Sequence, residues 1–380
     1  MNFNFTEEQI MIQQAAREYA ERELLKDVLE RDAKAEFPAQ HIKNLAELGF
    51  LGMMVDPKYD GGGMDTVSYA LAIEEISKID AATAVILSVH NSLACYGIEK
   101  FGTDFQKEKY LRDLAKGIKI GAFLLSEPEA GSDATMQHTL AEDRGDHYLI
   151  NGTKNWISTA KYASVYILIA QTNPEKRHHG INAFIVDSNS SGISLGQHED
   201  KMGMRSSDTY SVMFSDVKVP KENRIGEDGF GFKFAMQALE SGRIGIAAQA
   251  TGIATGAFER ALAYAKERKA FGKVIGMHQI IGFKLSDMAV KTEAARFFVQ
   301  KAAWLKDTHQ PFGIASAMAK QYAADIAMEV TTEAVQIFGG YGYVKEYHVE
   351  RLMREAKLTQ IYEGTSEIQK MIIARSLLRD

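Results

Sequence analysis

Glu363 is the carboxylate whose setting best suits acid–base chemistry. It lies in residues 358–369, Leu-Thr-Gln-Ile-Tyr-Glu-Gly-Thr-Ser-Glu-Ile-Gln, between two segments with apolar residues at helical spacing. Gly364 breaks that spacing, and Thr365 and Ser366 are typical helix N-cap residues, so the pattern predicts a short link between two packed helices. Such a link holds a side chain rigidly, and the following helix start favours negative charge. Glu363 is therefore a candidate general base, with an ordinary solvated carboxylate as the alternative.

A lone base needs a second group that accepts charge or electrons, and the sequence offers no familiar motif for one. No G-x-G-x-x-G pattern follows a predicted strand, and neither G-x-S-x-G nor H-E-x-x-H occurs. His178 and His179 have no acidic or thiol partners at suitable spacing, so we expect an exposed loop there and no metal site. An organic cofactor is the economical partner for the base.

Length and composition limit the class of protein. The chain has 380 residues, 46% hydrophobic and 25% charged, which is ordinary for a globular protein of two or three domains. A net charge of −6 with interspersed signs argues against nucleic acid as the main partner. The single cysteine, Cys95, excludes an internal disulfide and fits a reducing compartment. We see neither a signal peptide nor a stretch apolar enough to cross a membrane, and expect a cytoplasmic or a processed organellar protein.

The elements that would position Glu363 fall into three blocks. Residues 1–116 have helical patterns throughout. Residues 117–228 contain short β-rich runs separated by Gly, Asn, Asp and Ser, which favours an antiparallel sandwich or barrel over βαβ units. Residues 229–380 are helical again, and their many small residues fit a four-helix bundle. The sequence therefore predicts an α+β multidomain protein with an N-terminal helical domain, a middle antiparallel β-domain and a C-terminal bundle.

Local signals within these blocks are more specific. Thr6-Glu7-Glu8-Gln9 predicts a capping box that opens the first helix. The run from Tyr148 predicts a strand that enters a tight turn at Asn151-Gly152. The C-terminal block predicts three long helices, at 234–268, 280–308 and 313–338.

Several separated motifs resemble those of the acyl-CoA dehydrogenase family. In chain order they are Leu125-Ser-Glu-Pro-Glu-Ala-Gly-Ser-Asp-Ala, Asn151-Gly-Thr-Lys-Asn-Trp-Ile-Ser, Arg268-Lys-Ala-Phe-Gly-Lys with His278-Gln279, Gln336-Ile-Phe-Gly-Gly-Tyr-Gly and Gln360-Ile-Tyr-Glu-Gly-Thr-Ser-Glu-Ile-Gln. The resemblance covers essentially the whole chain in the right order, which is far more specific than any one motif. It implies the family's fold, which has the same α, β, α order that the residue patterns predict.

The resemblance also implies a reaction, the FAD-dependent α,β-dehydrogenation of a fatty acyl-CoA to the trans-2-enoyl-CoA, as in fatty acid β-oxidation. In that reaction Glu363 takes the α-proton, the β-hydrogen leaves as hydride to flavin N5, and electrons pass to electron-transferring flavoprotein. The thioester oxygen must be held as charge develops, and the family uses the base's own N–H and a flavin hydroxyl for this. Burial beside substrate should raise the pKa of Glu363 toward the working pH.

Individual roles follow from the same resemblance. The residues expected to contact FAD within one chain are Phe123, Leu125, Ser126, Trp156, Ser158, Thr365 and Glu367. Those expected to reach FAD from a neighbouring subunit are Arg268, Phe271, Gln279, Gln336 and Gly340. This implies a dimer, within a homotetramer built as a dimer of dimers. The expected contacts to acyl-CoA are Ser132, Glu240, Arg243 and Gly364.

Without the resemblance, four of these residues have ordinary explanations. Trp156 would be a core aromatic residue, and Arg268 would be an exposed charge on a helix. Glu240 and Arg243, three apart on a helix, would form a surface ion pair.

The position of the base distinguishes subgroups of the family. In isovaleryl- and long-chain-type members the base comes from the residue just before the equivalent of Arg243, where this chain has Gly242. The surrounding Glu-Ser-Gly-Arg-Ile-Gly-Ile-Ala-Ala-Gln-Ala is most similar to short-chain, butyryl-CoA-type enzymes, so we expect a short- to medium-chain substrate. A branched-chain acyl-CoA dehydrogenase, an acyl-CoA oxidase and a non-catalytic flavoprotein or acyl-CoA-binding relative remain as alternatives.

Two stretches depart from the family pattern. Glu129 stands where the family usually has Gly, and Ser158-Thr159-Ala160 replaces a run of the Thr-Asn-Gly type. Both are expected in loops near the flavin.

Overall fold

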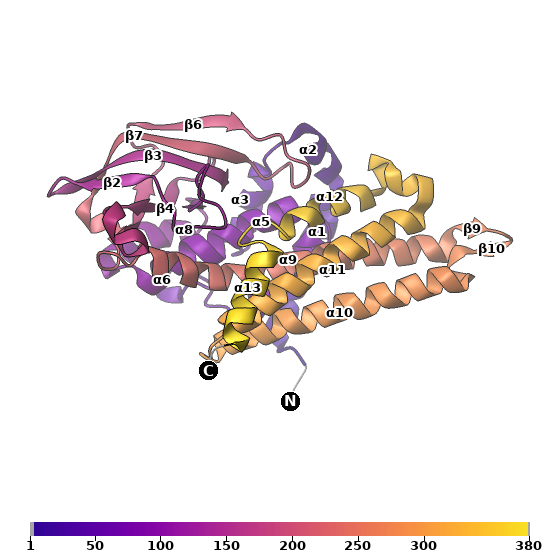
Figure 1. The fold of residues 1–380 in the computed structure, drawn as a ribbon. Helices are drawn as coiled ribbons and strands as arrows, with labels where there is room; N and C mark the ends of the chain where they lie inside the picture. Colours follow the sequence, from indigo (N-terminus) through magenta and orange to yellow (C-terminus); the bar gives the residue numbers. More distant parts are fainter. Residues whose placement is uncertain (1–3, 379–380) are drawn as a thin grey trace.

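A computed structural model describes residues 4–378 (Figure 1). Residues 1–3, which contribute to the expectation that no signal peptide is present, lie outside the described part. The predicted α, β, α order is confirmed. The first block contains α1 (Glu7–Arg22), α2 (Val28–Lys34), α3 (Ala39–Glu47), α4 (Thr66–Ser77), α5 (Ala81–Val89), α6 (Tyr96–Phe101), α7 (Asp104–Gln106) and α8 (Arg112–Ala115). The predicted capping box opens α1, with Thr6 and Gln9 each accepting the other's backbone N–H.

Helices α5 and α6 are joined by a π-helical segment, His90–Cys95, into one continuous apolar rod. The whole segment, Ala81–Phe101, has 21 residues and a mean hydropathy of 1.3. Our expectation that no stretch would be long and apolar enough to cross a membrane was therefore wrong on length and composition. Within the described residues this is the one such helix, and 94% of its apolar window is buried inside the protein, as in the core helix of a globular fold.

The middle block is one sheet of eight strands. They are β1 (Gly121–Leu124), β2 (Leu140–Asp143), β3 (His147–Ser158), β4 (Val165–Gln171), β5 (Ile181–Asp187), β6 (Ile193–His198), β7 (Thr209–Pro220) and β8 (Arg224–Ile225), in the order β6-β7-β3-β2-β4-β5-β8 with β1 beside β4. Most pairs are antiparallel, as predicted, but β4 pairs in parallel with β1 and, at one position, with β2. The sheet is mixed because β1 enters directly from the first helical block and not through a hairpin.

The predicted tight turn at Asn151-Gly152 does not occur, because β3 runs straight through it. Gly152 has φ +145° and lies at a bulge where the pairing of β3 with β7 shifts register. Asn151 Oδ1 accepts the N–H of Asp216 at 2.8 Å across the bulge. A Cβ at Gly152 would lie 2.6 Å from Cα of Thr139, so the glycine permits a close approach of strands.

The last block is a bundle of long helices. It contains α9 (Gly231–Glu267), α10 (Gln279–Asp307), α11 (Gly313–Phe338), α12 (Val349–Thr359) and α13 (Ser366–Leu377), and the small hairpin β9 (Lys269–Ala270) and β10 (Lys273–Val274) connects α9 to α10. The three predicted long helices agree with α9, α10 and α11 to within three residues. Figure 1 shows these three running side by side, with α13 near one end and the hairpin at the other.

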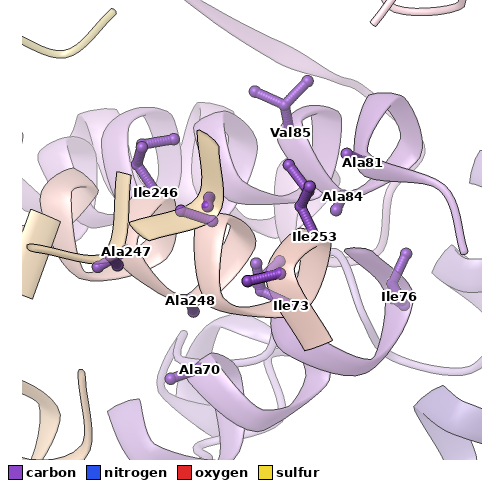
Figure 2. Packing of buried hydrophobic residues seen from close by; sticks show 14 of the residues in the cluster. Ala70, Ile73, Ile76, Ala81, Ala84, Val85, Ile246, Ala247, Ala248 and Ile253 are labelled. Atoms are coloured by element: carbon purple, nitrogen blue, oxygen red, sulfur yellow. The ribbon is translucent and has the colours of Figure 1, made fainter. Parts of the chain in front are cut away.

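The core beneath the site forms where the first block packs on α9. Figure 2 shows Ile73 and Ile76 of α4 beside Ile253 of α9, with alanines between the helices. A Cβ at Gly252 would lie 2.3 Å from the backbone oxygen of Glu74, so α4 and α9 are in backbone contact. This contact fixes α9, and with it the residues that face Glu363, relative to the N-terminal block.

Candidate active site

The link between α12 and α13 has the form that the sequence predicts. Thr365 is the N-cap of α13, and its Oγ1 accepts the N–H of Ile368 at 3.3 Å. Glu363 has φ +52° and Gly364 φ +92°, so two successive residues adopt left-handed conformations. A glutamate is strained in that conformation, and such strain persists only where the surroundings hold it. The chain therefore aims the Glu363 side chain from a constrained turn.

The Glu363 carboxylate is withdrawn from water. Both of its oxygens are buried and have no hydrogen-bond partner among the described residues. Burial raises the pKa of Glu363 from 4.5 to about 7, while the positive charges of Arg243 and Lys320 oppose the rise. A base with a pKa near neutrality accepts a proton efficiently at neutral pH. Glu363 is thus not the solvated carboxylate of the alternative interpretation.

Gly242 of α9 faces this carboxylate. A Cβ at position 242 would lie 2.2 Å from Oε2 of Glu363 and 2.9 Å from Cδ2 of Leu93 in the π-helical segment. A side chain at position 242 would therefore occupy the same space as the Glu363 carboxylate. In this chain the carboxylate comes from 363, and only a glycine at 242 leaves room for it.

Arg243 follows Gly242 and is itself buried, so it is not a surface residue. Within the described residues it forms no ion pair with Glu240. Burial lowers the pKa of Arg243, and the negative charges of Glu240 and Glu363 oppose this effect. Its Nε is buried without a hydrogen-bond partner. Because buried donors are nearly always satisfied, this nitrogen is a candidate ligand contact.

The four residues expected to bind acyl-CoA are only partly gathered. Arg243 and Gly364 lie at Glu363, and Glu240 is one turn from Arg243 on α9. Ser132 is exposed in the loop between β1 and β2, and within the described residues no hydrogen bond joins its side chain to the other three.

One further residue near Glu363, which is Lys320 of α11, was not identified from the sequence. It is fully buried, and its Nζ donates to the backbone oxygen of Gly364 at 2.7 Å. The one signal that could have revealed it is its isolation as the single basic residue among the small and apolar residues of α11.

The residues expected to line the flavin from the middle block lie together. Phe123 and Leu125 are half-buried at the end of β1, and Lys154 and Asn155 of β3 hold the chain there by hydrogen bonds to the oxygens of Leu125 (3.0 Å) and Ser126 (2.8 Å). Trp156, the next expected flavin contact, directly follows Asn155 on β3.

Trp156 is not the core aromatic residue of the alternative interpretation. Its side chain is 60% exposed and its φ is +61°. Ser158, two residues on, is half-buried. An exposed indole near half-buried apolar side chains suits an aromatic ring such as isoalloxazine. Thr365 and the exposed Glu367 mark the start of the 12-residue helix α13, where a pyrophosphate is favoured, so the residues present fit FAD.

The two departures from the family pattern are near these residues in the sequence: Thr159 and Ala160 follow Ser158, and Glu129 follows Ser126 by three residues. Thr159 has φ +64°, which a β-branched residue adopts with strain, and its buried Oγ1 has no hydrogen-bond partner among the described residues. The asparagine of the family pattern tolerates that conformation better. Glu129 is exposed and 3.6 Å from His138, so its carboxylate points to solvent.

The other expected flavin contacts lie elsewhere. Arg268, Gln279, Gln336 and Gly340 are exposed at the end of the bundle near the β9–β10 hairpin, and the guanidinium of Arg268 lies over the ring of Tyr341. An open pocket of about 570 Å³ there is lined by Arg268 and Gly340. Arg268, which follows α9, is about 37 Å from Arg243 at 1.5 Å per residue along that helix. One chain therefore does not bring Arg268 to the base, which Arg243 neighbours.

Phe271, at the tip of the hairpin, is 96% exposed with φ +51°. Met277 and Ile280, a few residues further on, are also exposed, and a group of exposed apolar side chains of this kind marks an interaction surface. The described residues contain no group of three or more His, Cys, Asp or Glu that could hold a metal ion.

The chain matches three domain models along its length. Residues 6–118 match the acyl-CoA dehydrogenase N-terminal domain, residues 122–217 the middle domain and residues 229–378 the C-terminal domain. A curated relative, the short-chain specific acyl-CoA dehydrogenase of Clostridium acetobutylicum, is 48% identical over 379 residues, which cover 100% of both chains.

Solved structures give the same result. Butyryl-CoA dehydrogenase from Megasphaera elsdenii superposes with a TM-score of 0.98 at 48% identity, with 100% of both chains covered. A chain from a structural study of the electron transferring flavoprotein of Acidaminococcus fermentans superposes with a TM-score of 0.99 at 49% identity, again over 100% of both chains. PigA with FAD and proline superposes with a TM-score of 0.96 at 30% identity, with 99% of both chains covered. The chain belongs to the acyl-CoA dehydrogenase family.

Proposed function

We propose that this FAD-dependent acyl-CoA dehydrogenase acts on a short- to medium-chain acyl-CoA and that Glu363 is its catalytic base. The observation that carries the proposal is the Glu363 carboxylate, buried, without hydrogen-bond partners and with a pKa near neutrality, at a point that Gly242 leaves open. The short-chain preference is supported by the relatives at 48% identity, which are short-chain specific.

In this proposal the chain's own residues move the proton and stabilise charge. Glu363 accepts the α-proton of the thioester, and negative charge develops on the thioester oxygen. The backbone N–H of Glu363 has no hydrogen-bond partner among the described residues, so it is available to donate to that oxygen. Gly364, which lacks a side chain, lets the thioester approach the turn. Bound FAD supplies the acceptor for the β-hydrogen as hydride.

The simplest test of this function is to add acyl-CoA to the purified protein without oxygen. We expect a yellow protein whose visible flavin absorbance is bleached by butyryl-CoA, because loss of the α-proton and β-hydrogen reduces the cofactor. Stopped-flow rates with butyryl-, hexanoyl-, octanoyl- and isovaleryl-CoA then give the chain-length and branching preference. A colourless protein, or a clear preference for isovaleryl-CoA, would contradict the proposal.

We infer that the flavin site is completed by a second copy of the chain. The support is the separation of about 37 Å along α9 between Arg243, beside Glu363, and the expected flavin contact Arg268, together with the exposed Phe271. A homodimer places the hairpin end of one chain's bundle at the other chain's flavin. By the same resemblance we propose a homotetramer built from two such dimers.

Replacing Phe271 by Asp should weaken this contact. We expect less bound flavin per chain and a smaller assembly, because a charge replaces the apolar side chain that the neighbouring copy would cover. Light scattering after size exclusion and the ratio of visible to ultraviolet absorbance measure both. Ile118→Asp is the control, since Ile118 is 68% exposed in a different part of the chain. Unchanged mass and flavin content in Phe271→Asp would contradict the shared site.

Electron-transferring flavoprotein is the electron acceptor that we propose. The support is the match at 49% identity to a chain from a structural study of such a flavoprotein. A cytoplasmic location is proposed from composition and from bacterial relatives such as the Clostridium acetobutylicum enzyme.

A further inference from the structure

Lys320 is a buried cation that the proposed reaction does not use. It lies on α11 and is 0% exposed. Its Nζ donates to the backbone oxygen of Gly364 at 2.7 Å, and no ion pair within the described residues includes it. A buried ammonium without a carboxylate partner is costly, so its presence beside Glu363 calls for a reason.

The bond to Gly364 is one half of a clamp on the strained turn. The second half is Gln369 of α13, also fully buried, whose Nε2 donates to the oxygens of Gly364 (2.9 Å) and Glu363 (3.2 Å). The Gly364 carbonyl is thus held by side chains from two different helices, and the Glu363 carbonyl by Gln369. Because such a turn persists only where its surroundings over-determine it, these bonds are what keeps Glu363 aimed.

The charge of Lys320 also acts on the carboxylate. The charged groups that influence Glu363 are Arg243 from α9 and Lys320 from α11, and both lower its pKa against the larger effect of burial. Burial in turn lowers the pKa of Lys320 to about 8, with Glu363, Asp325 of α11 and Glu367 of α13 opposing and Arg243 adding to the effect. Asp325 is already engaged by hydrogen bonds from three neighbouring side chains.

We propose that Lys320 is a positioning residue for the base: it holds the Gly364 carbonyl, and with it the turn that aims Glu363, and it places a positive charge beside the carboxylate. The inference rests on the proposed function, in which Glu363 is the base. It extends that function to a residue that acts on the base through the Gly364 carbonyl and through its charge.

Two substitutions separate the hydrogen bond from the charge. Lys320→Met removes both, whereas Lys320→Gln keeps an N–H donor and removes the charge. We expect both variants to shift the pH profile of anaerobic flavin reduction upward by about one unit, because the desolvated carboxylate has lost one of two cations. At pH 7 the rate should fall roughly fivefold, because the ionised fraction of the base falls by that factor, and at high pH Lys320→Gln should recover further than Lys320→Met. Lys291→Met, which removes an exposed ion pair with Glu329, is the control and should leave the profile unchanged.

Thermal unfolding gives a readout that does not depend on catalysis. The pKa of Glu363 is about 7 in the folded protein and near 4.5 in the unfolded chain, so its contribution to stability falls as pH rises through this window. Lys320→Met should extend that fall above pH 7. The double variant Lys320→Met/Glu363→Gln should not show it, because the titrating group is gone.

The outcomes distinguish the two proposals. If Glu363→Gln is slow but Lys320→Met has an unshifted pH profile, the proposed role of Lys320 is overturned and the proposed base is not. This holds even if Lys320→Met is slower or less stable than wild type at every pH. A Glu363→Gln variant with the wild-type rate would overturn the proposed base and this inference with it.

Discussion

Glu363→Gln should slow the anaerobic reduction of flavin by butyryl-CoA by roughly 10³-fold, within the range that general bases contribute. The amide has nearly the shape of the carboxylate but cannot accept the α-proton, and the alternative base position is occupied by Gly242. Stopped-flow absorbance measures the rate. Glu329→Gln, which changes an exposed carboxylate on α11, is the control and should react at the wild-type rate. A Glu363→Gln rate within a few-fold of wild type would exclude this residue as the base.

The same substitution should stabilise the protein at alkaline pH. A pKa raised from 4.5 to about 7 means that the folded state favours the protonated carboxyl, so ionisation above pH 7 costs about 3 kcal/mol of stability. Glutamine carries no charge to desolvate and avoids that cost. We therefore expect the melting temperature of Glu363→Gln to exceed that of wild type at pH 8 and the difference to shrink toward pH 5. The wild-type reduction rate should rise with pH through about 7 as the base ionises.

Gly242→Ala is expected to slow the reaction roughly 100-fold through Glu363. The added methyl would lie 2.2 Å from Oε2 and 3.0 Å from Cδ of Glu363, so the carboxylate must turn away from its present position. A displacement of about 1 Å at a reacting group costs on that order in rate. Flavin reduction by butyryl-CoA again measures the effect, and the melting temperature shows whether the fold is intact.

The double variant Gly242→Ala/Glu363→Gln is the control for this mechanism. If the alanine acts only by displacing the carboxylate, it should add little to the loss caused by Glu363→Gln, because effects on one functional unit are not additive. If the double variant instead loses rate by the product of the two single-variant factors, Gly242 contributes to the reaction independently of Glu363. A wild-type rate in Gly242→Ala would show that the turn yields to the methyl group.

Much of the fold could be predicted because its helices are long and carry strong local signals. The apolar spacing and small residues of α9, α10 and α11 placed their ends to within three residues. The Asn151-Gly152 signal failed because a bulge and a hairpin turn use the same residues, and only the pairing of β3 with β7 distinguishes them. The parallel pairing of β1 with β4 joins segments 44 residues apart, Gly121 and Val165, and no local pattern records it.

In the site, too, the features with local sequence signals could be predicted and those that depend on distant packing could not. The cap at Thr365 and the break at Gly364 are local, so the sequence placed Glu363 in its link. Its burial arises from packing against α9 and the π-helical segment, which are distant in the chain, so residue patterns alone could not show it, and only the resemblance led us to expect the raised pKa. Resemblance supplied the candidate ligand contacts, but the contact between Gly242 and the carboxylate, and the lysine behind the turn, emerge only when the helices are packed.

The length of α9 has a genetic consequence if each flavin site draws on two chains. Consider one allele that lacks the base at 363 and a second that is defective at Arg268. Each homodimer is inactive, but in a mixed dimer the first chain's arginine faces the second chain's intact base, and one of the two sites is complete. Two loss-of-function alleles, one at the base beside α9 and one at Arg268 just after it, would then complement each other, while two at the same site would not.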